Sequence, residues 1–175
     1  MTNTHDDKSL SEKEFCLENV ILESTAPVVK TDLIEKEKQS ALRDLHKGTF
    51  FKPLHGKKGP YTLTISLDGN RLLMGITNNS EDQFEDISFS LRIFKQIIKD
   101  YFIIVESYED AWRKGNISRL EAIDMGRRGL HNEGASRLQE VLETRVKMDF
   151  STARRLFTLI CVLCAGRRSS WQQQS

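Results

Sequence analysis

The spacing of apolar residues changes twice along the chain. Over residues 31–47, apolar side chains recur every three or four positions opposite a face of Glu and Lys. Thr31 or Asp32 is suited to cap the first turn and Gly48 follows the last, so this stretch predicts a helix. Before it, a weaker alternation over residues 14–22 predicts a first strand.

From about residue 50 the period shortens to two. Polar turns, among them Asp68-Gly69-Asn70, separate runs in which apolar and polar side chains alternate. The predicted strands span residues 50–54, 61–67, 71–77 and 84–90. We expect the first two of these strands to pair with each other, and the short links to produce an antiparallel meander with one face toward water.

Helical spacing returns at Ser90, where a long helix is predicted to begin and to continue to about Gly115. Around residues 101–105 it is apolar on nearly every side, which indicates the central helix of the core. Ser118-Arg119-Leu120-Glu121 then matches a capping box and opens a helix that Gly126 would close. A further helix is predicted to start near Asn132.

The final stretch adds one strand and one helix. Residues 146–148 favour a short strand, and Asp149 or Ser151 would cap a last helix that runs through Ala165. Together the elements predict an α+β fold, with an antiparallel β-meander of about four to five strands packed against a long central helix and C-terminal helices.

A chain of 175 residues, 38% hydrophobic and 29% charged, has the size and composition of one globular domain with its own core. We expect that single α+β domain over residues 14–165. A disordered lead-in over residues 1–13 would precede it, and a flexible tail over residues 166–175 would follow.

Charge and apolar runs restrict the partners. A net charge of +1 and a pI of about 7.7 make a nucleic-acid partner unlikely. Residues 126–175 are nevertheless basic, with nine Lys/Arg against four Asp/Glu. The longest apolar run, residues 156–165, is about half of a membrane-spanning helix, and the polar start resembles no secretory signal. We therefore expect a cytoplasmic protein without a membrane partner.

The cysteines agree with a reducing compartment, because Cys16, Cys161 and Cys164 are odd in number and lie in or near apolar runs. Cys161 and Cys164 form a CxxC pattern, which could be a redox pair or half of a metal site. No second CxxC accompanies it, so two inert buried thiols are the favoured interpretation. No metal or cofactor is predicted.

Candidate chemistry concentrates in residues 121–134, where two arginines, a histidine, acids and glycines stand between two predicted helices. Arg127 and Arg128 could grip a carboxylate or phosphate, and a helix start at Asn132 with Glu133 in its first turn could add backbone N–H donors. This predicts a small-anion pocket lined by these residues and His131. Helix capping alone accounts for most of the same positions without a ligand.

Two alternatives concern His131 and the arginines of the last helix. His131 could act as a general base oriented by Asp124 or Glu133, although no nucleophile with a known signature accompanies it. Arg154 and Arg155 stand at the helix end that disfavours cations. They are therefore expected either in solvent or in a charge network. Its candidate acids are Glu121, Asp124 and Glu133.

Several short motifs are spread along the chain: Gly59-Pro60-Tyr61, residues 98–102, Ser107-Tyr108, residues 121–134, Asp149-Phe150 and residues 152–159. In these motifs the chain resembles a known bacterial family, uncharacterised protein family 0262. It covers roughly residues 15 to 164, and Cys164 is not part of the pattern. Because the family is defined by sequence and has no assigned activity, the resemblance implies no catalytic or binding residues.

The function that the residues favour is a non-catalytic binding module with a small anionic ligand at residues 121–134. A protein-interaction or regulatory partner is the alternative, suggested by the basic C-terminal third and the missing catalytic signature. An enzyme that uses His131 comes third.

Overall fold

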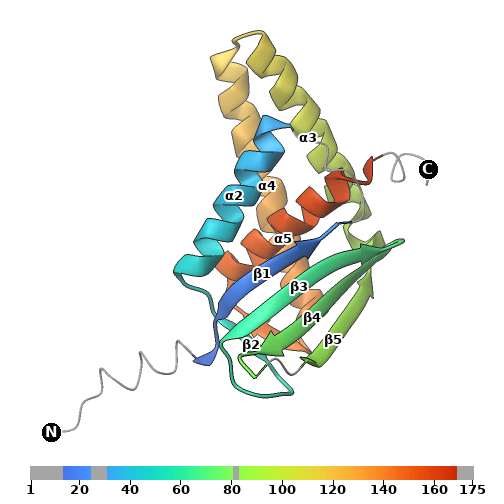
Figure 1. The fold of residues 1–175 in the computed structure, drawn as a ribbon. Helices are drawn as coiled ribbons and strands as arrows, with labels where there is room; N and C mark the ends of the chain where they lie inside the picture. The colour runs from blue at the N-terminus through green and yellow to red at the C-terminus, as the bar shows by residue number, and fades with distance from the viewer. Residues whose placement is uncertain (1–13, 25–30, 81–82, 169–175) are drawn as a thin grey trace, which may run out of the picture.

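The computed structural model describes residues 14–24, 31–80 and 83–168. The lead-in expected over residues 1–13 and most of the expected tail, residues 169–175, lie outside these ranges. Helices gather on one side of a twisted sheet (Figure 1). The predicted α+β class is therefore confirmed.

The sheet is mixed. Its strands, in spatial order, are β1 (Leu17–Glu23), β3 (Tyr61–Asp68), β4 (Arg71–Asn78) and β5 (Gln83–Ser90). From β3 to β5 the pairing is antiparallel, as predicted, but β1 runs parallel to β3. The prediction of a purely antiparallel meander is wrong because a helix lies between β1 and β3 in the chain, and a crossover through a helix returns the chain in the same direction.

A second, two-stranded ladder joins distant parts of the chain. β2 (Phe51–Pro53) pairs antiparallel with β6 (Val146–Met148), with Phe51 opposite Met148. The predicted strand at residues 146–148 is confirmed, whereas the predicted pairing of β2 with β3 is wrong. Residues 54–60 do not form a tight turn that would pair β2 with β3. β2 pairs instead with β6, the strand just before the last helix.

Four α-helices and one 3-10 turn complete the described fold. They are α2 (Asp32–Lys47), η1 (Leu91–Phe94), α3 (Lys95–Arg113), α4 (Ile117–Leu142) and α5 (Phe150–Ala165). Thr31 caps α2 by accepting a hydrogen bond from the Ile34 N–H, as predicted. Ser90 caps the 3-10 turn, so the long α-helix begins one turn later than expected.

The central helix is α5. It lies against the sheet and under α2 and α4 (Figure 1), and nearly all of its residues from Thr152 to Ala165 are buried. α3, which the sequence favoured for this place, leaves Ile103 and Trp112 about 60% exposed. The physical reason is that α3 carries charged residues toward both of its ends, on either side of the apolar residues 101–105, whereas α5 carries none for the ten residues after Arg155.

α4 is one continuous helix, which corrects the prediction that Gly126 closes one helix and Asn132 opens another. Its cap is Asn116, which accepts a hydrogen bond from the Arg119 N–H, and not Ser118. A glycine inside a helix costs only about 1 kcal/mol relative to alanine, and packing on α3 and α5 outweighs that cost. Residues 121–134 are therefore the middle of a helix and not a connector.

Cys161 and Cys164 are free and fully buried in α5. Burial raises the pKa of the Cys161 thiol well above its usual value and that of Cys164 to about 12. Both thiols are therefore protonated and pack as small apolar groups. In the described ranges, no helix has the length and apolar character to cross a membrane.

Candidate functional site

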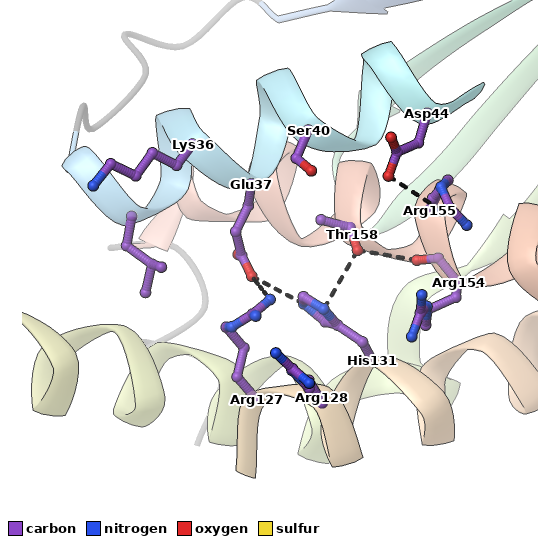
Figure 2. A pocket seen from close by; sticks show the side chains of 11 residues that line it. Lys36, Glu37, Ser40, Asp44, Arg127, Arg128, His131, Arg154, Arg155 and Thr158 are labelled. Atoms are coloured by element: carbon purple, nitrogen blue, oxygen red, sulfur yellow. Dashed lines mark hydrogen bonds and ion pairs between the residues drawn. The ribbon is translucent and has the colours of Figure 1, made fainter. Parts of the chain in front are cut away.

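A polar cleft of about 430 Å³ lies where α2 faces α4 and α5 (Figure 2). Helical spacing explains why each helix offers several side chains to it, because residues three and four apart share a face. α2 contributes Leu33, Lys36, Glu37, Ser40 and Asp44; α4 contributes Arg127, Arg128 and His131; α5 contributes Arg154, Arg155 and Thr158.

Glu37 is the buried acid of the cleft, with 6% of the residue exposed. Its Oε1 accepts a hydrogen bond from Arg127 Nη1 at 2.6 Å, and its Oε2 accepts one from the Tyr101 hydroxyl at 2.5 Å. Burial raises the pKa of Glu37, and the Tyr101 and Arg127 hydrogen bonds act against that rise. Arg127 therefore holds α2 to α4 through a desolvated ion pair.

Arg127 and Arg128 share one further carboxylate on their own helix. Asp124 accepts from Arg127 Nη2 at 2.6 Å and from Arg128 Nε at 2.9 Å. The two arginines differ in environment, because the Arg127 side chain is 20% exposed and that of Arg128 is 68% exposed. Arg127 is therefore a structural cation, and Arg128 stands at the mouth of the cleft.

His131 lies on the floor of the cleft between Glu37 and Thr158 (Figure 2). Its Nε2 is 3.6 Å from Glu37 Oε1, and its Nδ1 is 3.5 Å from Thr158 Oγ1. Burial, reinforced by the charges of Arg127 and Arg154, lowers its pKa to about 3. His131 is therefore neutral at physiological pH.

Thr158 and Glu37 flank the two ring nitrogens of His131 at long distances. The Thr158 hydroxyl donates to the carbonyl oxygen of Arg154 at 3.0 Å, and its oxygen lies 3.5 Å from Nδ1. Nε2 is buried, and no described residue forms a hydrogen bond with it. The acid that faces this histidine is Glu37 of α2, and not Asp124 or Glu133 as the sequence suggested.

A second ion pair crosses the cleft from α5 to α2. Arg155 Nη2 contacts Asp44 Oδ2 at 3.2 Å, and Arg155 also bonds to the carbonyl oxygen and hydroxyl of Ser151. The acid that pairs with the arginines of α5 is therefore Asp44, and not one of the three acids that the sequence suggested. Arg154, the residue before Arg155, lines the cleft without a carboxylate partner among the described residues.

Asn132 and Glu133 are exposed on α4 and do not line the cleft. The glycines around them have other roles than approaching a ligand. A Cβ on Gly134 would lie 2.1 Å from the ring of Phe157, so this glycine lets α4 pack closely on α5. Gly129, in contrast, faces open space.

Sequence reasoning missed the α2 side of the cleft entirely. One signal was present, because Glu37 stands three and four residues from Ile34 and Ala41, inside the apolar stripe of α2. A charged residue in such a stripe indicates a buried ion pair, although nothing in the sequence identifies Arg127 as its partner.

Comparison with known proteins covers nearly all of the part of the chain that the structure describes. No solved structure matches the chain. The sequence profile of the Uncharacterised protein family (UPF0262) matches residues 14–165. A UPF0262 protein of Rhizobium johnstonii is 45% identical over 154 residues, which cover 88% of this chain and 98% of the relative. A UPF0262 protein of Xanthobacter autotrophicus is 50% identical over 131 residues, covering 74% and 80%. The chain therefore belongs to the uncharacterised protein family UPF0262.

Proposed function

We propose that this chain is a non-catalytic module that binds a small oxyanion in the cleft between α2, α4 and α5. The observation that carries the proposal is the charge of Arg154, which is unpaired within the described ranges. Its guanidinium lines the cleft next to Arg155, yet no described carboxylate pairs with it. Arg155 already pairs with Asp44, so Arg154 is the cation on this wall whose charge a bound anion would neutralise.

The charge of the whole lining supports an anionic ligand. Five cationic side chains, Lys36, Arg127, Arg128, Arg154 and Arg155, face two carboxylates, Glu37 and Asp44. Both carboxylates already pair with an arginine, at 2.6 Å and 3.2 Å, and Asp124 beside the cleft pairs with Arg127 and Arg128. These three acids still leave the five cations with an excess of positive charge, and guanidinium groups suit phosphate and carboxylate oxygens.

The geometry around His131 supports binding over catalysis. Glu37, His131 and Thr158 form a carboxylate–imidazole–hydroxyl series, but the two separations are 3.6 and 3.5 Å. The hydroxyl hydrogen of Thr158 is donated to a main-chain carbonyl one turn earlier. A hydroxyl engaged in this way is no activated nucleophile, so this series serves to order the floor of the cleft.

The test is a thermal-shift and calorimetric panel of inorganic phosphate, nucleotides and small carboxylates. Arg154→Gln is compared with Arg137→Gln, which removes the same charge from an exposed position of α4 outside the cleft. An anion at a hundred times its Kd should stabilise the wild type and Arg137→Gln by about 2.7 kcal/mol. Arg154→Gln should lose most of that gain. A panel without any stabilising anion, or equal gains in both variants, would refute the proposal.

A further inference from the structure

We infer that Asp44 is a built-in competitor for the ligand: in the free protein its carboxylate occupies Arg155, and a tetrahedral oxyanion replaces it there on binding. The inference rests on the proposed function and adds the ligand class and the residue that sets its affinity. It starts from a difference among the ion pairs of the cleft (Figure 2).

The Asp44–Arg155 pair is the weaker of the two that hold α2. Glu37 meets Arg127 at 2.6 Å, and these two side chains are 5% and 20% exposed. Asp44 meets Arg155 through one contact of 3.2 Å, and these side chains are 30% and 23% exposed. A single, partly hydrated contact is much easier to exchange for a ligand than a short, desolvated one.

Arg155 has donor capacity that Asp44 does not use. Its Nη1 bonds to Ser151, and its Nη2, which carries two N–H groups, bonds to Asp44 through one contact; its Nε is buried and has no hydrogen-bond partner among the described residues. A guanidinium and a carboxylate at best form two parallel hydrogen bonds, so this pair falls short of that arrangement. An anion placed between Arg155 and Arg154 would gain from both cations, whereas Asp44 contacts only one.

The donors come from two helices, which favours a tetrahedral oxyanion. Arg154 and Arg155 stand on α5, and the Ser40 side chain lines the opposite wall, one turn before Asp44 on α2. One bidentate guanidinium already satisfies a planar carboxylate, whereas the oxygens of a phosphoryl group accept from several directions. The ligand class is therefore a phosphoryl group, either free or at the end of a larger molecule.

The decisive variant is Asp44→Asn, which keeps the shape of the side chain and removes its charge. Without the competing carboxylate, inorganic phosphate should bind about fivefold more tightly by calorimetry. Glu133→Gln removes the same charge from an exposed site outside the cleft and should leave the Kd unchanged. Glycerol phosphate and acetate complete the set: tighter binding of the ester places the phosphoryl group on a larger molecule. Preference for acetate over both phosphates would overturn the ligand class.

Failure of this inference is distinguishable from failure of the proposed function. If Asp44→Asn binds phosphate no more tightly while Arg154→Gln still abolishes binding, Asp44 is no competitor and the oxyanion site stands. If Arg154→Gln binds as the wild type does, the site itself is wrong. A phosphate-bound crystal structure of the wild type checks the exchange without a variant. Asp44 should have left Arg155, and a retained Asp44–Arg155 contact would overturn the inference.

Discussion

The two halves of α4 lie on the same helix but are held by different forces. Its first half meets α2 through charge, because Arg127 bonds Glu37 at 2.6 Å across the cleft and Asp124 on its own helix. Its second half meets α5 through shape, since Gly134 leaves space for the ring of Phe157 and Leu138 is fully buried. The boundary between them falls at His131, which is buried but polar.

Because of this difference, the candidate function of α4 belongs to its first half and its close packing on α5 belongs to its second half. The half held by charge presents exchangeable polar groups to a cleft, and the half held by shape offers nothing to a ligand. Variants in the second half should therefore change the free energy of unfolding alone, whereas those in the first half should make that free energy depend on pH.

The largest effect is expected at Gly134. In Gly134→Ala the new Cβ would stand 2.1 Å from Phe157, whose side chain is fully buried and cannot retreat. Overpacking of this kind should cost more than about 3 kcal/mol in urea unfolding. Gly129→Ala is the matched control, because that position faces open space on the same helix. It should raise stability by about 1 kcal/mol. Equal effects of both variants would show that α4 does not pack on α5 through Gly134.

A slightly smaller loss of stability is expected when the first half of α4 loses the positive charge of Arg127. Arg127→Met keeps a long apolar stem but leaves the Glu37 carboxylate buried without a counter-charge, which should cost about 3 kcal/mol at pH 7. Burial raises the pKa of Glu37, so lowering the pH and protonating this carboxyl should relieve part of that cost.

Arg128→Met is the control for Arg127→Met. Arg128 pairs with Asp124 on the same helix, but its side chain is 68% exposed. A surface pair of this kind should change stability by less than about 1 kcal/mol. If Arg128→Met destabilised the protein as much as Arg127→Met, the contrast between a buried and an exposed pair would be refuted.

The same contrast explains what could be predicted from the sequence. Strands β3, β4 and β5 follow from alternation and tight turns, and α2 follows from a cap, a stripe and a terminal glycine, because all of these signals are local. Two pairings are not local: β1 beside β3, and β2 beside β6. No short-range pattern encodes them.

The candidate site was half predictable for a similar reason. Arg127, Arg128 and His131 attracted attention because they cluster in sequence, and Arg154 and Arg155 because helix electrostatics disfavours them where they stand. The glycines misled the interpretation of α4, because a helix-ending glycine and a close-packing glycine look alike until Phe157 is in place. The α2 wall could be found only from the tertiary structure, because Glu37 and Asp44 stand 90 and 111 residues before the arginines that they contact.

The smallest effect concerns His131 and the pH dependence of stability. Its pKa is about 3 in the folded protein and about 6.5 when unfolded, so below pH 6.5 the unfolded state binds a proton that the folded state does not. The stability that neutral His131 contributes is therefore complete above pH 6.5 and is lost as pH falls toward 3. Between pH 7 and pH 5 the loss should be about 2 kcal/mol.

The pH dependence from Glu37 has the opposite sign. Its raised pKa makes the folded state bind a proton more readily than the unfolded state, so its contribution to stability rises as the pH falls through the folded-state pKa. The wild-type curve alone therefore mixes two contributions, and the readout must be a difference. Urea unfolding of the wild type and His131→Gln at pH 7 and pH 5 isolates the histidine: the variant should lack the loss of about 2 kcal/mol. His46→Gln, which removes an exposed histidine from α2, should keep the wild-type change. An unchanged pH dependence in His131→Gln would mean that the floor of the cleft admits water and protons, and that the boundary between the two halves of α4 is less sharply buried than the contacts of His131 indicate.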